Sequence, residues 1–134
     1  MSARGGSPLR DFRRPRLWLA LWWLAIVTVI VLSLTPPPPM AVPRNFDKVE
    51  HLLSYGFLAT GAVLLFARWR ALLCAAAGLV AMGIALEFAQ GMLTQTRMAA
   101  PADAAANATG VLLGLLLAFT PAARWLQRLD ARLR

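Results

Sequence analysis

The stretch ALLCAAAGLVAMGIALEFAQ, residues 71–90, decides the fold, because it is an apolar run long enough to cross a bilayer as a helix. A helix that spans the hydrocarbon core needs about 20 predominantly apolar residues. Three further runs of the same character occupy residues 17–34, 51–66 and 104–120. The sequence therefore predicts an all-α protein, with a four-transmembrane-helix bundle over residues 17–120.

Composition favours a membrane protein and excludes several other classes. Of the 134 residues, 59% are hydrophobic and only 15% are charged, whereas soluble domains carry about 25% charged residues. The mean hydropathy is +0.60. A chain of this length forms one domain, which leaves no room for a soluble enzyme beside the bundle. Cys74, the single cysteine, excludes an intrachain disulfide, and we expect it to be a small buried residue.

The net charge of +8 has a simpler explanation than nucleic-acid binding, and no nucleic-acid partner is predicted. Basic residues before the first run, between the second and third runs, and after the fourth are Arg4, Arg10, Arg13, Arg14, Arg16, Arg68, Arg70, Arg124, Arg128, Arg132 and Arg134. The other side of the bundle carries only Arg44, Lys48 and Arg97. Because short cytoplasmic loops are enriched in Lys and Arg, we expect a multi-pass protein of the inner (plasma) membrane with both termini in the cytoplasm.

The segments that flank the bundle are basic. Residues 1–16 are expected to form a cytoplasmic N-terminal segment, and residues 121–134 a cytoplasmic tail. In the tail, Trp125 and three leucines recur at helical spacing beside arginines. This pattern predicts a short C-terminal amphipathic helix that lies on the inner leaflet, with a solvated basic tail as the alternative.

Two acidic residues are expected to cap helices. Asp47, with Glu50 three residues later, resembles a capping box at the start of the second helix. Asp103 follows Pro101 and is placed to cap the fourth helix.

Polar residues at membrane depth form the candidate site. At 1.5 Å per residue, His51 and Glu87 each lie about 24 Å from the inner boundary, and Asn107 about 20 Å. In a hydrocarbon core about 30 Å thick, they share a level just beneath the outer interface. Further polar residues follow at i,i+3 or i,i+4 and so lie on the same helix faces. The predicted polar cluster comprises Asp47, Lys48, His51, Tyr55, Glu87, Gln90, Arg97, Asp103 and Asn107.

Glu87 is the strongest functional candidate of this set. It lies near the C-terminal end of the third helix, where the helix dipole disfavours an anion. It therefore needs a cationic partner or a proton, and Arg97, Lys48 and His51 are the candidates. A purely structural pair that holds the bundle together is the alternative.

Small residues recur at every fourth position of the fourth run. Ala106, Gly110 and Gly114 form a stripe that lets a neighbouring helix approach closely. The neighbour belongs either to the same chain or to a second copy, so the stripe leaves an oligomer open.

The polar residues also resemble a known family. The ordered set Asp47-Lys48-x-x-His51-x-x-x-Tyr55, Glu87-x-x-Gln90, Arg97 and Asp103-x-x-x-Asn107-x-x-Gly110 is similar to the signature of VanZ-like membrane proteins. The family's namesake is associated with low-level glycopeptide (teicoplanin) resistance, so the resemblance implies a setting in the cell envelope. It implies no reaction. The family would place a small polar residue, often Ser, near Ala100, and this chain departs from that pattern.

The first of three hypotheses of function is a binding protein. Lys48, His51 and Arg97 would meet an anionic lipid headgroup or a lipid-linked cell-envelope precursor. Glu87 and its polar neighbours would orient those cations. The partner is then a membrane lipid.

The second hypothesis is a membrane-embedded enzyme, with His51 and Glu87 as general base and acid and Arg97 stabilising an oxyanion or phosphate. One histidine is too few for a typical zinc site, although His51 with two carboxylates is a conceivable triad. No catalytic residue, metal or cofactor is predicted. The third hypothesis is proton-coupled transport, which the apolar inner halves of the helices disfavour.

Overall fold

The computed structural model describes residues 6–36, 43, 45–93 and 100–133. In chain order the elements are α1 (Pro15–Leu34), α2 (Phe46–Leu65), α3 (Trp69–Leu93), α4 (Pro101–Leu115), η1 (Leu116–Phe119), η2 (Pro121–Arg124) and α5 (Trp125–Arg132). No strand forms within these described ranges, so the prediction of an all-α protein is confirmed.

Several helices have the length and composition of membrane spans. Among the described helices, three are long and apolar enough to cross a membrane: α1, α3 and Pro101–Phe119, which joins α4 to η1. They expose large apolar side chains, among them Leu24, Phe88 and Leu112. A helix that is apolar on its outer faces as well as its inner face is typical of a membrane protein. The fourth predicted run lies in α2, whose 20 residues include the charged Asp47 and Lys48 near its start.

Cys74 shows what composition alone leaves undecided. Its side chain lies on α3 and is exposed, so the expectation of a buried cysteine is wrong. In a membrane span, apolar residues face lipid as well as neighbouring helices, so an apolar surrounding in the sequence does not place a residue in the core.

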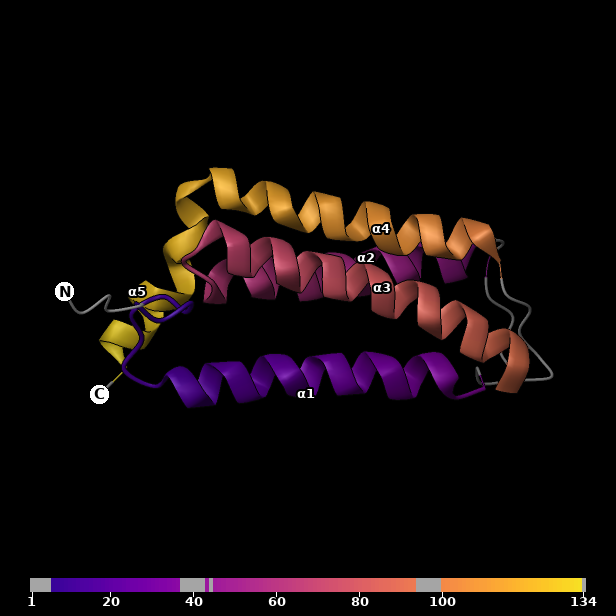
Figure 1. The fold of residues 1–134 in the computed structure, drawn as a ribbon, viewed down its shortest axis with the longest axis horizontal. Helices are drawn as coiled ribbons and strands as arrows, with labels where there is room; N and C mark the ends of the chain where they lie inside the picture. The colour runs from indigo at the N-terminus through magenta and orange to yellow at the C-terminus, as the bar shows by residue number, and fades with distance from the viewer. Residues whose placement is uncertain (1–5, 37–42, 44, 94–99, 134) are drawn as a thin grey trace.

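The core of the bundle lies along α2. Leu58, Ala59, Ala62 and Val63 have no exposed surface. Helices α1 to α4 run alongside one another (Figure 1), and α2 packs most extensively against α4. Because α2 is enclosed by its neighbours, it buries more apolar surface within the chain than α1 does.

The glycine stripe of α4 explains this close packing. A Cβ added at Gly114 would lie 2.6 Å from the carbonyl oxygen of Gly56, and one at Gly110 would overlap the carbonyl oxygen of Leu52. Two of the small residues singled out in the sequence are therefore buried against a helix of the same chain. An oligomer through Ala106, Gly110 and Gly114 stays a prediction.

Helix α1 is joined to α2 by a tryptophan. The Trp22 indole Nε1 donates to the carbonyl oxygen of Leu58 at 2.9 Å, inside the bundle. A Cβ at Gly61 would lie 2.7 Å from Trp22 Cδ1, so this glycine leaves the space for the indole ring.

Both ends of the described chain lie at the same end of the bundle, which we call the terminal end (Figure 1). There the Arg10 guanidinium donates from Nη2 to the Val63 carbonyl oxygen at 3.0 Å, near the C-terminus of α2. The Arg10 backbone amide donates to the Leu65 carbonyl oxygen at 2.8 Å. The predicted C-terminal helix is present as α5, and its Asp130 is buried against residues before and within α1.

The two predicted helix caps are wrong. Helix α2 begins at Phe46, and its N-cap is Asn45 in a left-handed conformation with φ 65°, so Asp47 lies inside the first turn. Helix α4 begins at Pro101, with Ala100 as N-cap. Proline is favoured at the first position of a helix, because it has no amide N–H to leave unbonded there. Asp103 therefore also lies inside the first turn of its helix and does not cap it.

Candidate functional site

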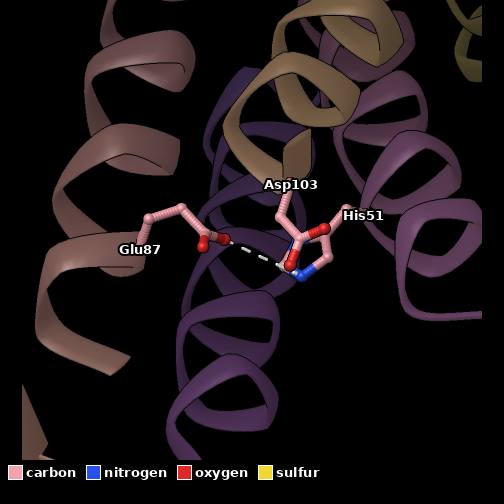
Figure 2. A group of neighbouring side chains, drawn as sticks. All are labelled: His51, Glu87 and Asp103. Atoms are coloured by element: carbon pink, nitrogen blue, oxygen red, sulfur yellow. Dashed lines mark ion pairs between the residues drawn. The ribbon is translucent and has the colours of Figure 1, made fainter. Parts of the chain in front are cut away.

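Three helices bring one ionisable side chain each to the end of the bundle opposite the terminal end. His51 lies near the start of α2, Glu87 near the end of α3, and Asp103 in the first turn of α4. Figure 2 shows the three side chains pointing toward one another. One nitrogen or oxygen atom from each lies within 4.8 Å of the other two. We call these three residues the triad.

The triad is largely shielded from the surroundings of the bundle. Glu87 is 5% exposed and Asp103 is 7% exposed, and the His51 side chain is 10% exposed. Moving an ionised carboxylate into such surroundings is costly unless hydrogen bonds or opposite charges compensate. The partners of each group therefore decide what the site can do.

His51 links Glu87 to Asn107. The ring Nε2 lies 3.9 Å from Oε1 of Glu87, so one of the partners expected for this carboxylate is in place. The ring Nδ1 lies 3.0 Å from the side-chain oxygen of Asn107. An amide oxygen only accepts hydrogen bonds, so Nδ1 carries a proton and donates it. In the neutral ring, Nε2 then turns its lone pair toward Glu87.

Glu87 also reaches the start of α4. Its Oε2 accepts a hydrogen bond from the backbone amide of Ala100 at 3.4 Å. Ala100 is the N-cap of α4, where backbone amides lack partners within the helix and the dipole favours a negative charge. The carboxylate of Glu87 is thus held between the imidazole of α2 and the N-terminus of α4.

Lys48 connects the triad to the surface. Its Nζ lies 3.6 Å from Oδ1 of Asp103 and 3.5 Å from Oδ2 of Asp47. The Lys48 side chain is 38% exposed and the Asp47 side chain 50%, whereas Asp103 is buried. Asp47 therefore belongs to the rim of the site and Asp103 to its interior.

Tyr55 and Asn107 line the site on its inner side. Tyr55 is 1% exposed and Asn107 2%. The Tyr55 hydroxyl and the Asn107 Nδ2 make no hydrogen bond to any described residue. Two buried donors are thus present without an acceptor, which is uncommon in native proteins and requires an explanation.

Gly83 is a site residue that the sequence analysis missed. A Cβ at this position would lie 3.0 Å from Asn107 Nδ2 and 3.2 Å from Tyr55 Cε1. The glycine therefore lets α3 approach both side chains. The signal in the sequence is its spacing, since Gly83 and Glu87 are i,i+4 on the buried face of α3.

One member of the predicted polar cluster bonds to a different helix, and another lies outside the described residues. Gln90 is buried, but its Nε2 donates to the carbonyl oxygen of Ser33 at 2.7 Å, which ties α3 to α1. Arg97 lies outside the described residues, so its part in the site stays a prediction.

An apolar groove leads toward the site from the flank of the bundle. It lies between α1 and α2, has a volume of about 530 Å³, and is lined by residues including Leu24, Ala25 and Phe57. A smaller pocket of about 30 Å³ shares Val29 and Ser54 with the groove and is also lined by His51 and Tyr55. The groove therefore lies next to the small pocket that His51 and Tyr55 line.

Comparison with protein-family models, with curated proteins and with solved structures finds no match to this chain.

Proposed function

We propose that this chain is a four-span membrane protein of the VanZ-like type, which binds a lipid or lipid-linked cell-envelope precursor with an anionic headgroup. One observation carries the proposal: the apolar groove between α1 and α2 adjoins the pocket beside His51 and Tyr55, with which it shares Val29 and Ser54. An acyl chain in the groove would place a polar headgroup next to the triad.

The groove has the size and lining that a hydrocarbon chain requires. Ligand sites are typically about 300–1,000 Å³ and mostly apolar, with a few polar groups that fix orientation. The groove of about 530 Å³ is lined by leucines, Val29 and Phe57, with the hydroxyl residues Thr28 and Ser54 among them. It opens on the flank of helices whose apolar side chains are exposed, which in a membrane is where lipid chains lie.

Lys48 supplies a charge that an anionic headgroup needs. Lysine binds phosphate as a point charge, and its long side chain extends toward an interface. The partly exposed Lys48 lies at the same end of the bundle as the pocket, held between Asp47 and Asp103. The predicted topology puts this end at the outer face, and the predicted contribution of Arg97 would add a second cation there.

Proton-coupled transport is less well supported than binding. Leu58, Ala59, Ala62 and Val63 occupy the bundle between the triad and the terminal end, and none has exposed surface. This buried apolar layer separates the triad from the terminal end of the bundle. An acid/base enzyme remains the second candidate, because His51 Nε2 and Glu87 Oε1 lie 3.9 Å apart in buried surroundings.

Photo-crosslinking in proteoliposomes tests lipid binding. The probe is a phosphatidylglycerol that carries a diazirine in one acyl chain, and mass spectrometry identifies the labelled residues. We expect labels at groove residues such as Leu53 and Phe57. Ala25→Phe should fill the groove and remove most of this labelling, whereas Ala20→Phe, at an exposed position of the same helix outside the groove lining, should leave it unchanged.

A second comparison tests the headgroup contact. Lys48→Gln should reduce labelling by the anionic probe and leave labelling by the corresponding phosphatidylcholine probe unchanged. Labels spread evenly over the exposed faces of α1 and α3 in every variant would show that the groove holds no particular lipid, and would refute the proposal.

A further inference from the structure

The triad has the composition of a metal site as well as that of a polar cluster. It offers one imidazole nitrogen and two carboxylates, from three different helices, with atoms that lie within 4.8 Å of one another (Figure 2). From these ligands and the surroundings described below, we propose that His51, Glu87 and Asp103 bind a single divalent first-row transition-metal ion such as Zn²⁺. This inference goes beyond lipid binding and does not depend on it.

The geometry needs only a small adjustment to accept an ion. Zinc binds histidine nitrogen and carboxylate oxygen at about 2.0–2.2 Å. The His51 Nε2 and Glu87 Oε1 atoms face each other at 3.9 Å, which is wider than a hydrogen bond and leaves space between them. Rotation of the side chains would bring all three ligand atoms to bonding distance.

Asn107 holds the His51 ring in one orientation, as a hydrogen-bond partner that does not itself bind the metal does at many metal sites. A histidine that binds a metal almost always donates its other ring N–H to a carboxylate, carbonyl oxygen or water. His51 Nδ1 makes this bond to Asn107 at 3.0 Å, which leaves the lone pair of Nε2 directed at Glu87. A cation between Nε2 and the Glu87 carboxylate would be bound by the lone pairs of both groups.

The surroundings of Asp103 also favour a cation. This residue is 7% exposed, and ionised groups in the interior of a bundle are costly. Lys48 lies 3.6 Å from Asp103, but its side chain is 38% exposed and is shared with Asp47. A cation bound by the triad would place further positive charge beside this buried carboxylate.

The buried donors beside the triad point to the same conclusion. Tyr55 lines the same small pocket as His51, and its buried hydroxyl makes no hydrogen bond to any residue in the described ranges. With three protein ligands, a zinc ion keeps a fourth position for water or substrate. A water molecule in the pocket that His51 and Tyr55 line would give the Tyr55 hydroxyl an acceptor.

The donor set also selects the class of ion. Mg²⁺ and Ca²⁺ prefer all-oxygen sites, whereas imidazole suits Zn²⁺ and its neighbours in the first transition row. We therefore expect Zn²⁺ to bind to the untagged, chelator-treated protein in detergent at one ion per chain, and Mg²⁺ not to bind. Isothermal titration calorimetry measures both, and X-ray absorption of the zinc-loaded protein should show a nitrogen ligand among oxygens.

Two carboxylates that both pair with Lys48 provide a matched control. Asp103→Asn removes a ligand and should weaken zinc binding about tenfold or more, while Asp47→Asn should leave binding unchanged. Glu87→Gln should weaken zinc binding to the same extent as Asp103→Asn. Asn107→Leu removes the hydrogen-bond partner of His51 and should weaken zinc binding by about 10–100-fold. Circular dichroism and gel filtration establish that each variant is folded.

The wild-type protein alone can overturn the proposal. If it binds no Zn²⁺, the metal site does not exist. Zinc binding that Asp47→Asn weakens as much as Asp103→Asn, or an absorption spectrum with a sulfur ligand, would place the ion elsewhere on the chain and refute the assignment as well.

Discussion

Among single residues, Asp130 is the buried charge that no sequence pattern indicates. It lies in α5 and is 1% exposed. It accepts hydrogen bonds from the Trp18 indole Nε1 at 2.7 Å and from the backbone amide of Arg13. Burial by itself would raise the pKa of Asp130, but the bonds from Trp18 and from the backbone amides of Arg13 and Arg14, with the charge of Arg14, lower the pKa below its ordinary value.

This arrangement predicts a pH-dependent contribution to stability. The pKa of Asp130 is lower in the folded chain than in the unfolded one, so its contribution is present above the unfolded value and is lost as the pH falls through the folded one. We expect Asp130→Asn to lower the melting temperature in detergent at neutral pH. The difference from the wild type should shrink at pH values below about 4, the ordinary pKa of aspartate.

Asp11→Asn is the control for this experiment, because Asp11 is exposed in the same N-terminal segment. It should melt as the wild type does at both pH values. Equal melting of Asp130→Asn and the wild type at neutral pH would show that the contacts of Asp130 add nothing to stability.

The contrast between the triad and Asp130 shows which residues a sequence can place. His51, Glu87 and Asn107 were predicted to share a level, because the rise per residue fixes depth along a straight helix. Asp130 lies in a basic tail that resembles solvated chain, and its burial depends on how α5 folds back onto α1. Gln90 was predicted as a member of the polar cluster, and the sequence did not indicate that its Nε2 would donate to Ser33 of α1.

At the level of helices, the pairing of α2 with α4 depends on glycines. Gly110 and Gly114 of α4 lie against the backbone of α2 at Leu52 and Gly56. Side chains at these points would push the helices apart and carry His51 away from Asp103. The spacing of the small residues predicted a close contact, whereas only the tertiary structure identifies α2 as the partner.

The α2–α4 contact predicts opposite effects for two glycine substitutions. Gly110→Ala introduces a methyl group that would overlap the α2 backbone, so we expect it to destabilise the bundle by about 1–3 kcal/mol. Gly78→Ala on α3 meets no atom of the described chain within 4 Å. It should be neutral or stabilise by up to about 1 kcal/mol, because alanine favours the helix. Unfolding of both variants in denaturant measures the difference, and equal stability would contradict the close contact.

Helix bounds show a second limit of the sequence. The apolar runs began at residues 17, 51 and 104, whereas α1, α2 and α4 begin at Pro15, Phe46 and Pro101. A helix extends into polar residues as long as its backbone bonds and first turn are satisfied, and proline is favoured at its first position. The apolar run therefore marks the part of a helix that has the composition of a membrane span rather than the whole helix.

For the whole molecule, both termini lie at the same end of the bundle, and this bears on how many helices span the membrane. Figure 1 places α5 and both ends of the described chain beside the start of α1. Helix α2, with 20 residues, runs beside α3 and α4 and is enclosed by them. If α1, α3 and α4 cross a membrane, α2 crosses with them, since its neighbours hold it in the same layer. An even number of spans then returns the chain to the side on which it began.

Cysteine labelling tests this topology and its orientation together. In a Cys74→Ser background, a cysteine at Asn45 precedes α2, and one at Arg70 lies at the start of α3, at the terminal end. Because basic residues gather at the terminal end, we expect a membrane-impermeant maleimide to label Asn45→Cys in intact cells and to label Arg70→Cys only after the membrane is opened. Labelling of both sites from outside would show that α2 does not span the membrane. The reverse pattern would invert the bundle and move the triad and Lys48 to the cytoplasmic face, where the proposed envelope precursor would have to be bound before its export.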